Sequence, residues 1–403
     1  MKKLFFLFFV LEISVSYSQI QWQINKDTVI TYYYQGGDEF SDTEISKDKW
    51  KSWYGWARSI TSNKEQQYYS DYKNHKVKNG NLYITCQKQD VNERLIDWMK
   101  DGDSIKSGKG VFQGLNKRDF KYVSGLIQSE QKYLKGYYEI KFKAPPDKGL
   151  WPAFWLYGGS PNEEIDIMEL KGEREDQTHV DTHCQGCDKV RNAIGQKRSF
   201  GGWLKLNGDL DKGYNIISCL WDENEVRFYL NGKCIAVAKV KFTQPKHVVA
   251  NIAVPANDGP FHPGPNKDVE KFSPFVIDYI RVWTRDEALV KDFALKATDV
   301  NTAPDNTFVK RSPKMLYGKK KEHTNDGIFV SLLKNDDGTL KLFCNGLSKK
   351  EKYKVKVSNG DQVQFEKETD ARELNIPVAI TNGTKIEIFY ENQKVEKTFL
   401  FTR

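Results

Sequence analysis

Three acidic residues stand close together in the middle of the chain, at Glu164, Asp166 and Glu169. In a β-strand successive side chains point to opposite faces, so residues two apart share a face. Glu164 and Asp166 therefore lie together, whereas strict alternation would turn Glu169 to the other side. A β-bulge at Ile167-Met168 would supply the one extra residue that re-aims Glu169. We therefore expect three carboxylates on one face of a bulged strand.

Carboxylates arranged in this way can cleave a glycosidic bond by double displacement. One attacks the sugar, and a second, about 5–5.5 Å away, first protonates the leaving oxygen and then deprotonates water. Repulsion within the group should raise the pKa of at least one carboxyl above that of a free acid. A solvated acidic face of an antiparallel sheet is the competing interpretation. It leaves the nearby Trp151 and Trp155 unexplained, whereas sugar rings stack on aromatic faces, so we expect both tryptophans to bind substrate.

The segment 149–156 followed by 164–169 resembles the signature of glycoside hydrolase family 16. More narrowly, it is similar to the bulged-motif branch that contains laminarinases, β-agarases, porphyranases and κ-carrageenases. The resemblance implies that Glu164 is the nucleophile, Asp166 its orienting partner and Glu169 the general acid/base. It extends over roughly residues 38–283.

The same resemblance implies roles for residues outside the acidic motif. His183 matches a family histidine close to the cleaved sugar, with a purely structural histidine as the alternative. Asn251 falls on an inner strand from which its amide would hydrogen-bond sugar. Asp278, with backbone carbonyls near Glu39 and Gly80, would bind a structural calcium, which prefers oxygen ligands; a satisfied surface aspartate is the alternative. Catalysis of this kind requires no cofactor.

The substrate class stays open. We expect a retaining endo-β-glycanase acting on β-1,3-glucan of the laminarin type, with agarase-, porphyranase- or carrageenase-type hydrolysis of marine galactans as the alternative. Residues 158–163 lack the tryptophan that laminarinases tend to carry just before the nucleophile, and 255–264 depart from their glycine-rich form. These departures and the formal net charge of +8 favour the galactans. A non-catalytic carbohydrate-binding protein is the alternative from another class, and the complete acidic motif argues against it.

The N-terminus indicates export. Residues 1–18 have the charged start, short apolar run and small final residues of a secretory signal peptide, with cleavage before Gln19. We therefore expect a secreted, periplasmic or cell-surface protein. The apolar run is too short to cross a bilayer, and no later stretch is apolar enough, so no membrane span is expected.

Composition narrows the partners further. The +8 charge is spread over the chain and no recognition motif accompanies it, so nucleic acid is not an expected partner. A polysaccharide is the expected partner, and the protein is expected to be a monomer. Six cysteines allow disulfides, and Cys184 and Cys187 favour a local disulfide or free thiols over a zinc site.

Short alternating segments punctuated by glycine and asparagine predict an all-β protein. With 403 residues, two domains are the natural expectation. We expect a concave β-jelly-roll sandwich over 19–285, a linker over 286–313 and a smaller immunoglobulin-like β-sandwich over 314–403. The role of the second domain is open between a spacer, a carbohydrate-binding module and a surface-attachment signal. A loop over 90–118 is expected to wall the substrate site.

Overall fold

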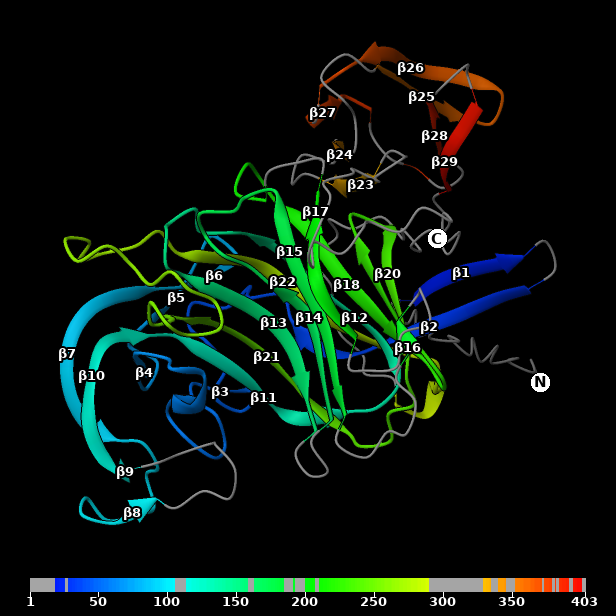
Figure 1. The fold of residues 1–403 in the computed structure, drawn as a ribbon. Coiled ribbons are helices and arrows are strands. Elements are labelled where there is room, and N and C mark those ends of the chain that lie inside the picture. The colour runs from blue at the N-terminus through cyan, green and yellow to red at the C-terminus, as the bar shows by residue number, and fades with distance from the viewer. Residues whose placement is uncertain are drawn as a thin grey trace, which may run out of the picture.

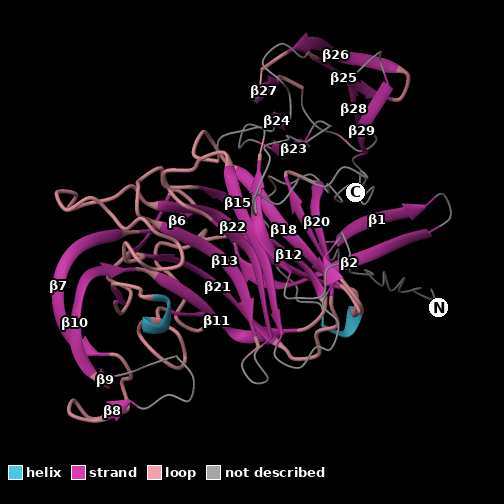
Figure 2. Ribbon diagram, viewed as in Figure 1, coloured by secondary structure: helices cyan, strands magenta, loops and turns pink. Residues whose placement is uncertain are grey.

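A computed structural model describes most of the chain, and it is built almost wholly of strands (Figure 2). The described residues are 19–25, 28–105, 114–158, 163–184, 191–192, 200–206, 210–289, 329–334, 340–345, 352–371, 373–378, 381, 384–390 and 394–400. Within them, two short 3-10 turns interrupt the strands, η1 (Thr61–Asn63) and η3 (Glu287–Leu289). In these ranges no helix has the length and apolar character needed to cross a membrane. The expected signal peptide, 1–18, lies outside the described residues.

Two large antiparallel sheets face each other and form the main domain (Figure 1). The inner sheet has the order β17 (Phe200–Lys205), β15 (Gln177–Cys184), β14 (Glu163–Glu169), β13 (Trp151–Tyr157), β21 (Lys246–Ala253), β11 (Leu126–Tyr133) and β3 (Trp50–Lys51). The outer sheet has the order β1 (Gln19–Asn25), β2 (Thr28–Asp38), β22 (Phe275–Thr284), β12 (Gly136–Lys143), β18 (Asn215–Trp221), β19 (Val226–Leu230), β20 (Lys233–Lys239) and β16 (Arg191–Asn192). Beside β22 lie β6 (Asn81–Ile84) and β5 (His75–Lys78). The expected all-β sandwich is confirmed.

Alternation along each strand builds the core between the sheets. Ile165 and Ile167 of β14 point into it, as do Phe154 of β13 and Ile140 of β12, all fully buried. Burying a side chain of this size contributes about 1.5–3 kcal/mol. The apolar layer therefore fixes which face of the inner sheet remains for polar side chains.

A curved ribbon flanks the inner sheet. It consists of β4 (Gln67–Tyr69), β10 (Lys117–Ser124) and β7 (Cys86–Arg94), with the short pair β8 (Ser104–Ile105) and β9 (Gly114–Leu115) at its end. The expectation of a loop over 90–118 that walls the site is therefore wrong in two respects. Part of it is strand, and none of its described residues lines the cleft. The physical reason is that Leu95 and Phe120 bury themselves together and hold the ribbon in a separate small cluster.

The C-terminal part forms two further antiparallel sheets. One has the order β23 (Phe329–Lys334), β24 (Leu340–Asn345) and β27 (Glu373–Ile376). The other has the order β26 (Gln362–Thr369), β25 (Tyr353–Asn359), β28 (Thr384–Tyr390) and β29 (Lys394–Leu400). Buried Leu342, Val355 and Ile386 come from both sheets, as an immunoglobulin-like sandwich would require. Most of the expected linker, from residue 290 onward, lies outside the described residues, and the domain boundaries stay predictions.

Candidate active site

A β-bulge in β14 brings the three acidic side chains to one face. In the pairing with β13, Phe154 lies opposite Met168 and Trp155 opposite Asp166, so Ile167 is the extra residue. Ile167 and Met168 are both buried in the core, which leaves the next side chain, Glu169, facing outward. The predicted bulge, and its consequence for Glu169, are confirmed.

Neighbouring strands surround each carboxylate with specific side chains. The residues lie in three rows across the inner sheet, which are Tyr157–Glu164–His183, Trp155–Asp166–Asp181 and Ala153–Glu169–His179–Trp203. Opposite residues in an antiparallel pair have Cβ atoms about 4.5–5.5 Å apart. The three carboxylates therefore have different environments even though they belong to one strand.

Glu169 is buried among aromatic and imidazole groups. Trp151 Nε1 donates to Glu169 Oε1 at 3.1 Å, and His179 Nδ1 lies 2.8 Å from Oε2. Burial, followed by the nearby Glu164 carboxylate, raises the pKa of Glu169 to about 8, against the opposing effects of His183 and Trp151. Burial also lowers the pKa of His179 to about 4. At neutral pH, Glu169 thus keeps its proton beside a neutral imidazole.

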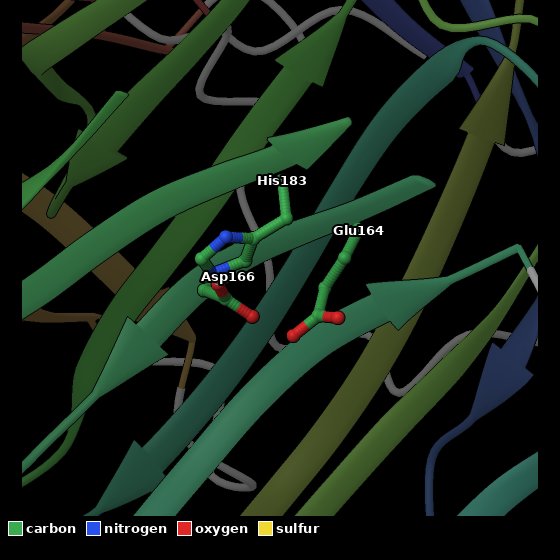
Figure 3. Close-up of side chains that lie close together, drawn as sticks. All are labelled: Glu164, Asp166 and His183. Atoms are coloured by element: carbon green, nitrogen blue, oxygen red, sulfur yellow. Dashed lines mark ion pairs between the residues drawn. The ribbon is translucent and has the colours of Figure 1, made fainter. Parts of the chain in front are cut away.

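Glu164, Asp166 and His183 form the second half of the site (Figure 3). Their oxygen and nitrogen atoms lie within 4.8 Å of one another. Glu164 and Asp166 share a hydrogen bond, and burial, then the Asp166 charge, raises the pKa of Glu164. His183 Nε2 lies 3.2 Å from Asp166 Oδ2 and 3.6 Å from Asp181 Oδ2. This spacing could also accommodate a divalent cation, but it would occupy the carboxylates that glycoside cleavage needs.

Trp151 and Trp155 line the cleft, and other side chains cover part of each ring. The ring of Phe261 stacks on Trp151 with centroids 3.9 Å apart and planes 3° from parallel. Trp155 Nε1 donates to Asn251 Oδ1 at 2.8 Å, and Asn251 Nδ2 donates to the Tyr69 hydroxyl at 2.9 Å. Both tryptophans are more than nine-tenths buried. They support the floor of the cleft, and the Asn251 amide holds Trp155 and Tyr69 in place.

The cleft encloses about 520 Å³. Several of the residues that line it are not predicted by the sequence. Glu65 lies in its wall, where it accepts hydrogen bonds from Gln67 Nε2 at 2.6 Å and the Ile60 N–H at 3.3 Å. Burial raises the pKa of Glu65 to about 7, although these donors oppose the shift. Trp56 and Trp203 also line the cleft. Glu65 could have been suspected from its place in a family-like segment, but nothing local marks Trp203, which reaches the site only through strand pairing.

The residues expected to bind calcium lie in β22 or next to strands that pair with it, and the carboxylates of Asp278 and Glu39 already have cations beside them. Asp278 forms an ion pair with the buried Lys141. Glu39 accepts from Arg281 Nε at 2.6 Å and Nη2 at 2.7 Å. Gly80 occupies the turn before β6, next to β22. The ammonium of Lys141 supplies to Asp278 the positive charge that calcium would bring. The calcium site stays a prediction.

Cys184 is disulfide-bonded, which agrees with a disulfide in this region rather than a zinc site. Cys187 lies outside the described residues. Cys86, Cys219 and Cys234 are free and buried.

Comparison with known proteins places this geometry in a family. The model of the glycosyl hydrolases family 16 matches residues 62–260, which include the acidic strand and both of its neighbours. Residues 62–260, just under half of the chain, therefore belong to glycosyl hydrolase family 16. Among curated relatives, an endo-1,3-1,4-β-glycanase (ExsH) of Rhizobium meliloti strain 1021 is 25% identical over 270 residues, covering 62% of this chain and 51% of the relative. A glucan endo-1,3-β-glucosidase (A1) of Niallia circulans is 24% identical over 281 residues, covering 61% and 37%.

The family 16 chain thus spans about half or less of the length of these two relatives. Among solved structures, the catalytic domain of an endo-1,3-β-glucanase (laminarinase) from Thermotoga petrophila RKU-1 is 25% identical. The match covers 63% of this chain and 98% of that one, with a TM-score of 0.47.

Proposed function

We propose that the family 16 domain is a retaining endo-β-glucanase that hydrolyses a neutral β-1,3- or mixed-linkage glucan. The observation that carries the proposal is the placement of Glu164, Asp166 and Glu169 on one face of the bulged strand, in unlike surroundings. The glucan class is supported by the curated relatives, which are named as endo-1,3-1,4-β-glycanase and glucan endo-1,3-β-glucosidase.

The reaction proceeds in two displacements. In the first, Glu164 attacks the anomeric carbon, the bond to the leaving oxygen breaks, and Glu169 gives its proton to that oxygen. The product is a sugar bound as an ester to Glu164. In the second, the ionised Glu169 takes a proton from water, whose oxygen attacks the same carbon and releases Glu164.

The surroundings of each carboxyl favour these roles. With a pKa of about 8, Glu169 holds the proton that the leaving group needs at neutral pH. The hydrogen bond between Glu164 and Asp166 requires one proton between them. When that proton resides on Asp166, Glu164 is ionised and can attack. Once Glu169 has lost its proton, neutral His179 can donate Nδ1–H to it.

The charge of the cleft favours a neutral substrate over a sulfated galactan. The described residues that line it include five carboxyl groups but no lysine or arginine, the five being Glu65, Glu164, Asp166, Glu169 and Asp181. Among these described residues a sulfate group would find no lysine or arginine to pair with. Among the described residues, the positive charge therefore lies outside the cleft lining and gives no support to a polyanionic substrate, although net charge had favoured the galactans in the sequence.

Aromatic side chains on both sides of the carboxylates support cleavage within a chain. Trp203 lies on β17, on one side of β14, and Trp56 contacts Tyr157 of β13, on the other side. Both tryptophans line the cleft. A polysaccharide that crosses the sheet would thus meet binding surfaces before and after the bond that breaks.

The proposal is tested with a panel of laminarin, mixed-linkage β-glucan, agarose, porphyran and carrageenan, scored for new reducing ends. The full chain should release oligosaccharides from a glucan, and Glu164→Gln or Glu169→Gln should lower the rate by about 10³-fold or more without loss of the folded structure. Release from a galactan alone would transfer the assignment to the galactan hydrolases. Binding of glucan without release would instead favour the non-catalytic alternative.

Retention of the anomeric configuration can be tested separately. Azide should restore turnover to a Glu164→Gly variant and yield an α-glycosyl azide, since the small anion attacks from the side that the carboxylate has vacated. A β-glycosyl azide, or no rescue, would contradict the role of Glu164 as nucleophile.

We also propose that the protein is exported. The mature protein should then begin at Gln19, as N-terminal sequencing of protein recovered outside the cytoplasm would establish. An intact N-terminus at Met1 would oppose this.

A further inference from the structure

Asp181 is an acidic residue of the cleft that takes no direct part in the two displacements. It lies on β15 directly opposite Asp166 of β14, and Gly201 of β17 lies opposite it on the other side. Its side chain lines the cleft and is only 14% exposed. Burial raises the pKa of Asp181 to about 7, against the effect of His183 and with a further contribution from Asp166. A buried carboxylate next to another carboxylate is unfavourable unless specific partners hold it there.

The fold provides a fixed place for the Asp181 carboxylate. The backbone N–H of Thr182 donates to its Oδ1 at 2.6 Å. The carboxylate lies over Gly201, where a Cβ atom would stand 2.0 Å from Oδ2 and 2.6 Å from Oδ1. Because any larger residue at position 201 would displace the carboxylate, the glycine in β17 is what leaves Asp181 its space.

His183 lies between Asp181 and Asp166. Its Nε2 is 3.2 Å from Asp166 Oδ2 and 3.6 Å from Asp181 Oδ2. Figure 3 shows the imidazole ring next to the Asp166 carboxylate. The side chain of His183 is 45% exposed, so packing alone does not fix the ring. Two carboxylates near one nitrogen therefore orient the imidazole, and Asp181 supplies one of them.

The register decides which member of the Glu164–Asp166 pair is affected more strongly by a charge on Asp181. Asp166 is directly opposite Asp181, which places their Cβ atoms about 4.5–5.5 Å apart, whereas Glu164 is diagonal to Asp181, at about 7–8 Å. A negative charge opposes the ionisation of a nearer carboxyl more than that of a farther one. An ionised Asp181 therefore favours the arrangement in which Asp166 holds the shared proton and Glu164 is ionised.

We propose that Asp181 is a positioning residue of the reaction, which keeps the proton shared by Glu164 and Asp166 on Asp166 and holds His183 beside that pair. Glu164 then stays ionised and can attack the anomeric carbon. Asp181 acts through these neighbours and exchanges no proton with the sugar. The inference rests on the proposed function, because it assigns Asp181 an effect on the nucleophile of that reaction.

A dependence on pH follows, because Asp181 itself titrates. With a pKa of about 7, it is mostly neutral at pH 5.5 and mostly charged at pH 7.5, so its effect on Glu164 should be present only at the higher value. In the described part of the chain, the titratable groups that face Asp181 are His179 and His183 of its own strand and Glu164, Asp166 and Glu169 of β14, whereas β17 places Gly201 there.

The test compares kcat/KM for the glucan that the protein cleaves between the unaltered chain and Asp181→Asn. The substitution removes the charge and keeps an oxygen for the Thr182 N–H. The variant should be about five- to tenfold slower at pH 7.5 and nearly equal at pH 5.5. Gly201→Ala should act in the same way, since it displaces the carboxylate. The matched control is Asp119→Asn, an exposed position of β10 outside the cleft lining, which should have no effect at either pH.

A second measurement removes the nucleophile. In a Glu164→Gly background rescued by azide, Glu164 no longer has an ionisation state for Asp181 to control. Asp181→Asn should therefore leave the rescued rate almost unchanged. A residue that only shaped the cleft would lower the rescued rate as well.

The outcomes separate this inference from the proposed function. Equal kcat/KM for the unaltered and Asp181→Asn proteins at pH 7.5 would refute the inference, while glucan hydrolysis would still support the function. The same loss at both pH values, or a loss in the azide-rescued background, would also refute it, because Asp181 would then have a structural role alone. If Asp181→Asn does not fold, Gly201→Ala decides by the same criteria. If the unaltered chain cleaves no glucan, the proposed function falls and the inference falls with it.

Discussion

Glu169 connects the local environment of one residue to the pH range of activity. It must be protonated to act as the acid, and its pKa is raised to about 8 by burial and by Glu164. Activity on a glucan should therefore fall as pH rises through about 8. Glu164 must be ionised to attack, and its pKa is raised. As the pH falls, activity should therefore be lost at a pH above about 4.3, the ordinary pKa of glutamate. These limbs belong to the coupled group, and kcat/KM measured against pH reports them. The assignment would be contradicted if the fall in activity with rising pH were already complete near pH 5.

Because Glu169 is buried, its ionisation should also lower the free energy of unfolding as the pH rises. Its pKa rises from an ordinary 4.5 to about 8 on folding, so the unfavourable effect is absent below about pH 4.5 and complete above about pH 8. Glu169→Gln removes the titration and should stabilise the domain by on the order of 5 kcal/mol at pH 8.5, with little difference at pH 4.5. Thermal unfolding of both proteins at the two pH values checks this. A gain in stability that is equal at both would point to another cause.

At the scale of the element, β14 is anchored by the residue before the nucleophile. Glu163 faces away from the cleft, where Lys246 Nζ lies 2.6 Å from its Oε2 and the backbone N–H groups of Thr243 and Gln244 donate to the same oxygen at 3.0 and 2.9 Å. Both members of the ion pair are fully or almost fully buried. This pair and the bulge together fix the two ends of the catalytic strand.

Breaking that anchor should impair the chemistry without touching the cleft. Lys246→Met leaves Glu163 buried without its cation and should destabilise the domain by about 3–5 kcal/mol. The small displacement of Glu164 that follows should lower kcat by about 10²-fold, with a lesser change in KM. The matched control is Lys117→Met, which removes an exposed ion pair with Asp101 and should leave the stability of the domain almost unchanged. Full kcat in Lys246→Met would show that the strand is positioned by the bulge alone.

At the scale of the whole molecule, the two sheets of the sandwich differ in the charged groups that they carry. The inner sheet carries the carboxylates, whereas the outer sheet buries ion pairs such as Lys141–Asp278 and Arg281–Glu39. Since Lys141 provides the charge opposite Asp278, a chelator should leave the melting temperature unchanged. Lys141→Met should lower it by an amount equivalent to about 3–5 kcal/mol. Added calcium that raised the melting temperature of the unaltered protein would instead support the predicted calcium site.

The sequence determined the all-β architecture, the bulge and the three carboxylates, because these depend on alternation along a single strand and on one extra residue at Ile167. It could not show that the ring of Trp151 is covered, since its stacking partner Phe261 is distant in the chain. The same holds for the pairing of His179 with Glu169, and for Lys141 beside Asp278. Net charge favoured the galactans in the sequence, whereas the described residues that line the folded cleft include carboxyl groups and no lysine or arginine. Alternation is a local property of the chain, whereas burial and charge around a side chain arise only when distant strands pack together.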